Sequence, residues 1–258
     1  MSADSHRAAE RGDLETPERR RIAYHRTRGR APGTVFLGGF MSDMEGTKAV
    51  HLEARARADG RAFLRFDYSG HGASSGAFTD GCISEWAADA IAVIEACTEG
   101  PQILVGSSMG GWIALLVARQ MPERIAGMVT IAAAPDFTED SMWAGLTDAQ
   151  RAEVMEAGQT LLPSDYDAPY PVTRKLIEDG RQNLVLRDAL HLPFPVRFLQ
   201  GTADESVKTS VALSLLNHAE GPDMRLTLVD GADHRFSDAQ CLELIDASIA
   251  DVLERATG

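Results

Sequence analysis

A serine in a glycine-rich turn is the residue of this chain best suited to nucleophilic chemistry. The apolar run 103–105 ends in Gly-Ser-Ser-Met-Gly (106–110), and an apolar, alanine-rich segment with helical spacing follows at 112–121. In so tight a strand-to-helix turn, side chains two residues before and after the serine would collide, so both positions favour glycine. The turn lifts the Ser108 hydroxyl out of the sheet and points the helix amino end at whatever that oxygen attacks. The pattern therefore predicts that Ser108 is a nucleophile.

The neighbouring serine does not compete for this role. The glycine positions that match Ser107 hold Val105 and Met109 instead. With 23 glycines in 258 residues, the five-residue pattern alone is a weak signal. Its position between a buried strand and a helix is what makes it specific.

A serine hydroxyl needs a base to take its proton, and the base needs a carboxylate to orient it. Both must follow strands that end at the same edge of the sheet as Ser108. Asp204 follows the expected strand 196–199, and His234 follows the expected strand 225–229. The chain order Ser, Asp, His is typical of this kind of turn. We therefore expect Ser108, His234 and Asp204 to form a catalytic triad.

Other carboxylates and histidines fit the triad less well. Glu205 and Asp233 adjoin the chosen residues, and Asp230 comes directly after the last strand, so all three remain rivals of Asp204. Asp204 is preferred because it terminates the loop Gly-Thr-Ala-Asp, whereas Asp233 should point away from its neighbour His234. His71 lies in the glycine-rich turn after the strand 62–68, where a structural role is expected. The other candidate bases have no strand-end placement and are expected to be surface or packing residues: His51, His191 and His218.

Acyl transfer also needs backbone donors for the oxyanion, each of which contributes on the order of 3 kcal/mol to lowering the barrier. The N–H of Met109, directly after the nucleophile, is the first expected donor. The second should come from the turn after the strand 34–37, where Gly38-Gly39 allows the backbone to approach a substrate. Phe40 is the preferred donor in that turn, and Met41 is the alternative.

The elements that position these residues alternate between strands and helices. Continuously apolar runs such as 125–134 are typical of strands covered on both faces, so the alternation predicts an α/β fold with a mostly parallel, doubly wound sheet. The expected strands are 21–27 (at an edge), 34–37, 62–68, 103–105, 125–134, 196–199 and 225–229. The expected helices are 46–59, 84–97, 112–121, 206–218 and 236–255.

The alternation breaks at about 135–190, where helical stretches at 147–158 and 173–188 occur without a buried strand. An insertion of this length between two strands predicts a helical lid over the active site. Residues 1–20 are polar and charged and are expected to form a flexible tail, and 21–258 to form a single domain that includes the lid.

Composition limits the partners and the compartment. Hydrophobic residues make up 44% of the chain, and the formal net charge of −13 argues against a nucleic-acid partner. No apolar run is long enough for a membrane span, and residues 1–20 are too acidic for a targeting peptide. Three widely spaced cysteines indicate buried thiols in a reducing compartment, so a cytoplasmic enzyme is expected. Neither a metal nor an organic cofactor is expected.

These residues resemble the α/β-hydrolase superfamily. The resemblance depends on the turn 106–112, on Asp204 and His234 at their strand ends, and on the position of the insertion. Gly-Phe-Met-Ser-Asp-Met (39–44), Arg-Phe-Asp-Tyr-Ser-Gly (65–70) and Asp-His-Arg (233–235) look like one branch of it. That branch contains a mitochondrial palmitoyl-protein thioesterase, also described as an acyl-glucuronide esterase, and many bacterial relatives.

The resemblance covers nearly the whole chain from about residue 34. It implies the α/β-hydrolase fold, the Ser108–Asp204–His234 triad, and acyl esters or thioesters as substrates. One departure is Gly38, where many members of the superfamily carry histidine. This departure leaves open whether Phe40 or Met41 supplies the second oxyanion N–H.

The expected reaction is hydrolysis of carboxylic esters or thioesters through an acyl-enzyme intermediate, with a small acyl substrate or an acylated protein as the partner. An amidase or aminopeptidase-like hydrolase and a non-catalytic ligand-binding protein are the alternatives that share these motifs.

Lys48 or Arg235 is the expected counter-charge for an acidic acyl-glucuronide. The oligomeric state stays open. An apolar acyl pocket is expected from Met41, Trp112, Phe137, Trp143 and Leu146.

Overall fold

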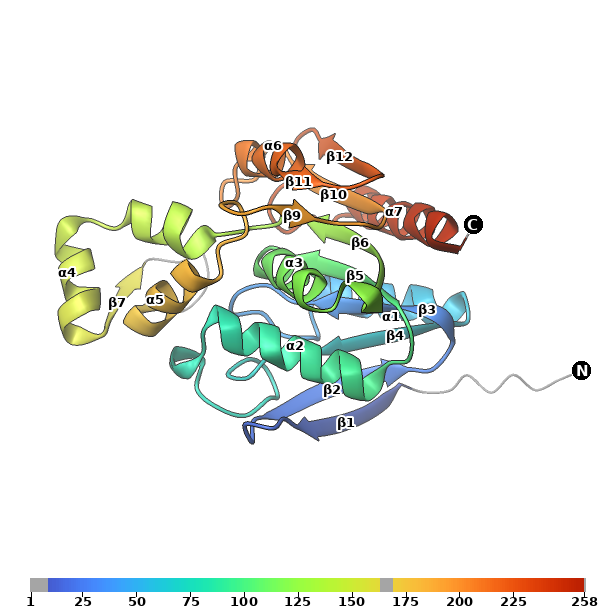
Figure 1. The fold of residues 1–258 in the computed structure, drawn as a ribbon, viewed down its shortest axis with the longest axis horizontal. Coiled ribbons are helices and arrows are strands. Elements are labelled where there is room, and N and C mark those ends of the chain that lie inside the picture. The colour runs from blue at the N-terminus through green and yellow to red at the C-terminus, as the bar shows by residue number, and fades with distance from the viewer. Residues whose placement is uncertain (1–8, 163–168, 258) are drawn as a thin grey trace, which may run out of the picture.

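The structure, a computed structural model, describes residues 9–162 and 169–257 and is organised around an eight-stranded sheet (Figure 1). Its strands are β1 (Glu10–Glu15), β2 (Arg21–Thr27), β3 (Arg30–Leu37), β4 (Arg61–Phe66), β5 (Gln102–Ser107), β6 (Ile125–Ile131), β10 (Val196–Gly201) and β12 (Met224–Val229). They are arranged in the order β1-β2-β4-β3-β5-β6-β10-β12. Only the β1–β2 and β2–β4 pairs are antiparallel, which confirms the mostly parallel α/β sheet.

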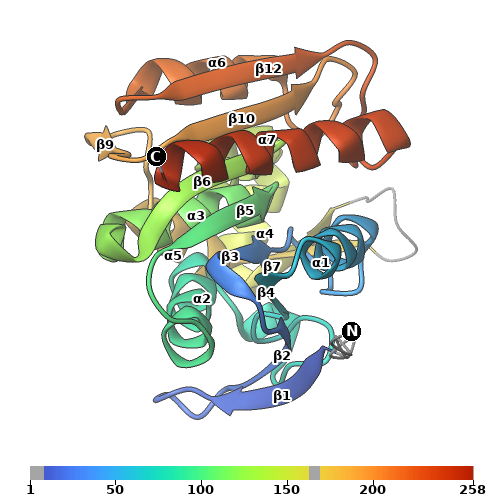
Figure 2. The ribbon, with the colours of Figure 1, turned by 90° about the vertical axis from the view of Figure 1, so that its right-hand side faces the viewer.

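Helices cover both faces of the sheet (Figure 2). They are α1 (Thr47–Ala58), α2 (Ile83–Cys97), α3 (Met109–Gln120), α6 (Thr209–His218) and α7 (Ala239–Thr257). Apolar side chains of α1 and α7 pack in one buried cluster, whereas those of α2, α3 and α6 pack in another. The two clusters lie on opposite faces, because strand side chains alternate between them: Val35 and Leu37 belong to one, and Phe36 to the other.

The central position of β5 explains its sequence. Every residue of β5 is buried, because β3 and β6 flank it and helices cover both its faces. A strand in that position reads as a continuous apolar run rather than an alternating one. The predicted helices and strands around Ser108 are therefore found close to their expected bounds.

The insertion follows β6 and extends away from the sheet at the left of Figure 1. It contains a π-helical segment (Thr138–Trp143), α4 (Asp148–Ala157), the antiparallel strands β7 (Gln159–Leu162) and β8 (Tyr170–Thr173), and α5 (Arg174–Gln182). Leu146, Val154, Val172 and Ile177 form a small core of its own. The two expected helices are present, and the β7–β8 ribbon is an addition that the sequence reading did not include. Two further short strands, β9 (Leu190–His191) and β11 (Ala219–Glu220), pair with each other beyond the insertion.

The amino-terminal segment differs from the expected tail. Residues 1–8 lie outside the described residues, but Glu10–Glu15 forms strand β1 and pairs in register along β2. Ion pairs support this pairing, with Arg21 bonded to Asp13 and Arg26 to Glu10 at 2.7 Å between Nη2 and Oε2. The expectation of a flexible tail is therefore wrong for this part, and β2 is an interior strand rather than an edge. Among the described residues, no helix has the length and apolar composition that crossing a bilayer requires.

Candidate active site

Ser108 lies at the junction of β5 and α3 in a backbone conformation that most residues avoid. Its φ is 54° and its ψ is −118°. Its N–H donates to the Ile131 carbonyl at 2.9 Å, and its own carbonyl accepts from the N–H groups of Gly111 (2.9 Å) and Ala134 (3.1 Å). These bonds hold the strained residue between β6 and α3, as expected where strain is part of a functional site. The predicted sharp turn is present.

The two glycines of the turn are required by contact. A Cβ at Gly106 would overlap the Gly110 carbonyl and lie 2.8 Å from Gly111 Cα. A Cβ at Gly110 would overlap the Leu37 carbonyl oxygen at the end of β3. Because backbone atoms cannot yield as a flexible side chain can, both positions need glycine for the reason that the sequence pattern suggested.

Asp204 and His234 are hydrogen-bonded to each other. His234 Nδ1 lies 2.9 Å from Asp204 Oδ2. The residues follow β10 and β12, which are neighbouring parallel strands, so their loops leave the same edge of the sheet. Cross-loop bonds fix the approach, since the Thr202 N–H donates to the Val229 carbonyl (2.9 Å) and the Ala203 N–H to the Ala232 carbonyl (3.0 Å).

The Asp204 carboxylate is fully surrounded by donors. Its side chain is 0% exposed. Oδ1 accepts from the N–H groups of Ser206 (2.9 Å) and Val207 (2.8 Å), and Oδ2 accepts from Gln200 Nε2 (3.0 Å) as well as from His234. Burial opposes ionisation, but these hydrogen bonds outweigh it and lower the pKa of the Asp204 carboxyl. The group is therefore held as a carboxylate, which is the form that orients an imidazole.

Gln200 is a residue that the sequence reading missed. It is 0% exposed and lies near the end of β10, four residues before Asp204. Its Nε2 also donates to the carbonyls of Val207 (2.9 Å) and Gly201 (3.2 Å). A polar residue near the buried end of a strand, four positions before a candidate acid, is the signal that could have identified it.

The rival carboxylates are occupied elsewhere or exposed. Asp233 Oδ1 accepts from the Phe236 N–H at 3.1 Å, and Asp230 Oδ1 accepts from Thr202 Oγ1 at 3.1 Å. Glu205 is exposed to solvent. Asp204 is thus the carboxylate that the structure brings to His234.

The other histidines have partners outside this site. His71 is buried among the rings of Tyr68, Phe78 and Trp86, and its Nδ1 lies 3.2 Å from the Ser69 carbonyl. His51 pairs with Asp246 at 3.0 Å, and His191 pairs with Glu220 at 3.0 Å. These histidines therefore contact other partners. Among the described residues, His234 is the only histidine whose ring nitrogen bonds to Asp204.

The loop after β3 lies against the turn that carries Ser108. A Cβ at Gly39 would lie 3.5 Å from Ser108 Cβ, so this loop has little room for a side chain there. Ser42 holds the loop through its N–H (3.2 Å) and its hydroxyl (2.7 Å), both donated to the Gly39 carbonyl. Phe40 and Met41 follow directly, and Met109 begins α3. The predicted oxyanion donors are thereby placed in segments that flank Ser108.

The expected acyl-pocket residues occupy different environments. The Phe137 ring lies 5.6 Å from Phe40 and 5.7 Å from Trp112, which is fully buried and donates its indole N–H to the Asn183 carbonyl (3.1 Å). Met41 is 41% exposed on the loop after β3. Trp143 and Leu146 lie within the insertion: Trp143 packs against the guanidinium groups of Arg151 and Arg181, and Leu146 is buried in its small core.

Lys48 is the second residue of α1, and its side chain contacts the loop that carries His234. Its ammonium donates to the carbonyl of Arg235. Burial lowers the pKa of Lys48, partly offset by the nearby Asp233 carboxylate. This contact connects α1 to the segment that carries His234, and the role of Lys48 or Arg235 as a counter-charge for a substrate carboxylate stays a prediction.

Known proteins share this architecture. The family described as serine aminopeptidase, S33 (Hydrolase_4), matches residues 35–174. The mitochondrial palmitoyl-protein thioesterase ABHD10 of Rattus norvegicus is 33% identical over 244 residues, covering 94% of this chain and 82% of the relative. A protein from Agrobacterium vitis S4 has a crystal structure that is 40% identical, with a TM-score of 0.91 and coverage of 95% of this chain and 99% of the other.

Alpha/beta hydrolase domain-containing protein 10 from mouse is similar as well, at 32% identity and a TM-score of 0.88, with coverage of 95% of this chain and 99% of the other. The sequence match covers 94% of the chain, and the structural match covers 95% of it. The chain therefore belongs to the α/β-hydrolase superfamily, as a serine hydrolase of the Hydrolase_4 family related to ABHD10.

Proposed function

We propose that this protein hydrolyses carboxylic esters or thioesters with Ser108 as nucleophile, His234 as general base and Asp204 as the orienting acid. The observation that carries the proposal is the 2.9 Å contact between His234 and Asp204 at one edge of the sheet, combined with the left-handed backbone of Ser108. The full-length similarity to a palmitoyl-protein thioesterase supports the substrate class.

The reaction proceeds in two acyl transfers. His234 Nε2 takes the Ser108 proton as Oγ attacks the carbonyl carbon, and Asp204 stabilises the imidazolium through Nδ1–H. The backbone N–H groups of Met109 and Phe40 donate to the oxyanion, with Met41 as the alternative to Phe40. His234 then protonates the leaving alcohol or thiol, which departs. Water, deprotonated by the same imidazole, attacks the acyl-enzyme and releases the acid. No step requires a metal or an organic cofactor.

The aromatic cluster around Phe40 supports an apolar acyl site. The centroid of the Phe40 ring lies 4.8 Å from that of Phe78, 6.1 Å from that of Trp86 and 5.8 Å from that of Tyr170 in β8. The Phe40 ring also contacts Phe137. Phe137 and Tyr170 belong to the insertion, whereas Phe40 belongs to the loop beside Ser108. We therefore propose that the insertion at about 135–190 acts as a lid that completes an acyl pocket with Met41, Trp112, Phe137, Trp143 and Leu146.

Two sources of the acyl group are compatible with this site. A small acyl ester or thioester and an acylated protein present the same reacting carbonyl, and similarity to a palmitoyl-protein thioesterase favours the acylated protein. We also propose a cytoplasmic location, which the three free, buried cysteines support. The relatives are described as mitochondrial, so cell fractionation followed by immunoblotting would distinguish the two compartments.

A substrate series tests the function. Hydrolysis of p-nitrophenyl esters and acyl-coenzyme A thioesters, from acetyl to palmitoyl, would be measured for the wild type, Ser108→Ala and Ser107→Ala. Ser107 is a matched control, because it adjoins Ser108 but lacks the flanking glycines. We expect hydrolysis to disappear only in Ser108→Ala. Undiminished hydrolysis in Ser108→Ala would overturn the nucleophile assignment.

The alternatives have their own outcomes in the same assay. Faster turnover of aminoacyl anilides than of any ester would favour an aminopeptidase, which is the activity named by the family description. Failure to hydrolyse every substrate, together with failure of a fluorophosphonate to label Ser108, would favour a non-catalytic ligand-binding protein.

A further inference from the structure

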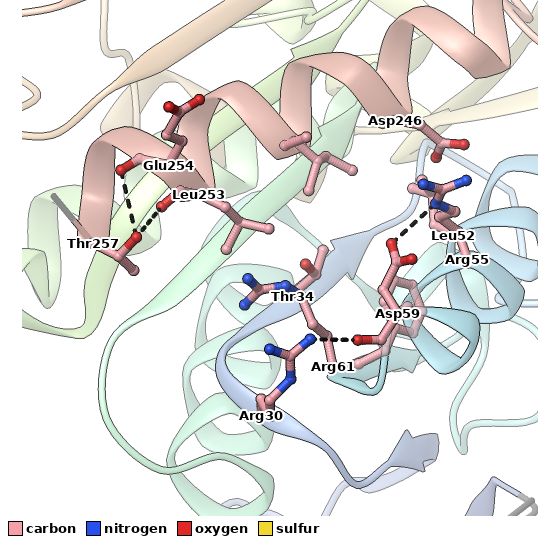
Figure 3. A pocket seen from close by; sticks show the side chains of 14 residues that line it. Arg30, Thr34, Leu52, Arg55, Asp59, Arg61, Asp246, Leu253, Glu254 and Thr257 are labelled. Atoms are coloured by element: carbon pink, nitrogen blue, oxygen red, sulfur yellow. Dashed lines mark hydrogen bonds and ion pairs between the residues drawn. The ribbon is translucent and has the colours of Figure 1, made fainter.

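A cavity of about 380 Å³ lies between α1 and α7, over the first residues of β3 and β4 (Figure 3). Its volume is within the range of small-molecule binding sites. Helix α1 contributes Leu52 and Arg55 to its wall, and α7 contributes Ile249 and Leu253. The cavity therefore forms where two helices on the same face of the sheet separate.

This cavity is remote from the candidate active site. Arg30 is the first residue of β3, whereas the loop beside Ser108 leaves the other end of that strand after Leu37. A strand of 8 residues spans roughly 23 Å. Arg61 is likewise the first residue of β4. The cavity consequently opens at the amino ends of β3 and β4, whereas the loop beside Ser108 follows the carboxyl end of β3.

Two arginines mark one end of the cavity. Arg30 and Arg61 are register partners on the adjacent parallel strands β3 and β4, and both side chains line the cavity. Figure 3 shows both side chains at the strand end of the pocket. Like charges at directly opposite positions destabilise a sheet unless something compensates them.

Neither arginine is compensated by a carboxylate within the described part of the chain. Arg30 donates through Nη2 to the Asp59 backbone carbonyl at 2.7 Å, and the Arg61 side chain has no hydrogen-bond or ion-pair partner among residues 9–162 and 169–257. Three acids line the cavity with the arginines. The Asp59 carboxylate accepts from Arg55 Nε (3.0 Å) and Asp246 pairs with His51 (3.0 Å), whereas Glu254 is an exposed residue of α7 that forms no ion pair with Arg30 or Arg61 among the described residues. Two neighbouring guanidinium groups without a carboxylate partner can bind an oxyanion, because it accepts hydrogen bonds from both.

Apolar side chains form about half of the rest of the wall, beside charged and polar ones. Leu52, Phe63 and Leu253 are at least nine-tenths buried and line the cavity beneath its mouth. Ile249 lines the same cavity from α7. An ion alone would leave this surface uncovered, whereas a ligand with an apolar body would cover it.

We propose that the α1–α7 cavity binds a small amphipathic oxyanion, with its carboxylate or phosphate between Arg30 and Arg61 and its apolar body against Leu52, Phe63 and Leu253. The site would serve a ligand other than the ester or thioester hydrolysed at Ser108, because the two sites lie at opposite ends of the strands. Its occupancy does not depend on the proposed catalysis.

Direct binding tests the proposal. Decanoate, decyl phosphate, decan-1-ol and inorganic phosphate would each be titrated into the protein and followed by calorimetry and by ¹H–¹⁵N shifts of α1 and α7. We expect saturable binding of decanoate or decyl phosphate with shifts in both helices, and at least tenfold weaker binding of decan-1-ol and inorganic phosphate. The better of the two anionic ligands identifies whether the natural head group is a carboxylate or a phosphate.

Variants connect the binding to the two arginines. Arg30→Gln/Arg61→Gln should weaken the anionic ligand at least tenfold. Arg119→Gln is the matched control, because Arg119, like Arg30, donates to a backbone carbonyl (Leu184, 3.5 Å) and does not line the cavity. Thermal unfolding verifies that the variants fold. Equal affinity for decan-1-ol, unchanged affinity in the double variant, or shifts confined to the Ser108 and His234 loops would each overturn the proposal.

Discussion

Gln200 and His234 donate to the same oxygen of Asp204, at 3.0 Å and 2.9 Å. Gln200 does so from a fully buried position in which its own Oε1 has no donor among the described residues. A buried acceptor without a partner costs free energy. The side-chain amide of Gln200 keeps this orientation because three acceptors surround its Nε2: the Gly201 and Val207 carbonyls and Asp204 Oδ2. Gln200 thus orients the carboxylate that in turn orients the imidazole.

Gln200→Leu should lower kcat about tenfold, because Asp204 loses one of its four donors and its orientation loosens. The variant should also lose about 1–3 kcal/mol in free energy of unfolding. Gln102→Leu is the matched control: Gln102 is buried as well, but its Nε2 donates to the carbonyls of Glu99 and Gly100, away from the site. Steady-state kinetics and urea unfolding would separate the two variants. Equal kcat values would show that Gln200 has a purely structural role.

Asp204→Asn should reduce kcat/KM by about three to four orders of magnitude, since an amide can no longer fix the donor tautomer of His234. Asp233→Asn should change it less than about fivefold, because Asp233 bonds to the Phe236 N–H rather than to the imidazole. The comparison would be made with the fastest ester of the substrate series. If the larger loss occurred in Asp233→Asn, the two acids would have to exchange roles.

Gly110→Ala should destabilise the fold by about 1–3 kcal/mol and impair hydrolysis, because the new methyl group meets the Leu37 carbonyl. Gly145→Ala is its control, since a Cβ there meets nothing within 4 Å. Differential scanning calorimetry and ester hydrolysis would be measured on both. Equal melting temperatures would contradict the close approach of α3 to β3.

The three cysteines should be unreactive in the folded protein. Burial raises the pKa of the Cys82 thiol to about 12, and burial together with Asp238 raises that of Cys241 to about 11. At pH 8 both groups therefore stay protonated, and the thiolate is the species that alkylating reagents attack. Mass spectrometry after iodoacetamide treatment should find little modification in native protein and complete modification in guanidinium chloride. Rapid native labelling of Cys82 would contradict its burial.

The sequence predicts the Ser108 turn well because its glycines are imposed by backbone contacts, which leave a recognisable pattern. It predicts the buried strands of the sheet for a similar reason, since β5 must be apolar on both faces. Strand β1 was not predicted because its sequence, Glu-Arg-Gly-Asp-Leu-Glu, contains almost no apolar residues. Ion pairs with β2 stabilise the strand instead. Its place in the sheet follows from a neighbouring strand rather than from its own composition.

Features that combine distant segments could not be predicted. The α1–α7 cavity joins residues near positions 30, 61 and 250, and no local pattern links them. The contact between Lys48 and the Arg235 carbonyl likewise connects two segments that are close only in the folded chain. The lid and the oxyanion donors stay predictions, and the substrate series and the acyl-chain preference would test them.

The order of the strands has a consequence for synthesis of the protein. Ser108 follows β5, whereas β10 must pair between β6 and β12 before Asp204 and His234 can meet. A nascent chain that has emerged only as far as β6 contains Ser108 but neither Asp204 nor His234. If the proposed triad carries the reaction, hydrolysis requires β12 to dock beside β10, and the onset of activity would report that the sheet is complete.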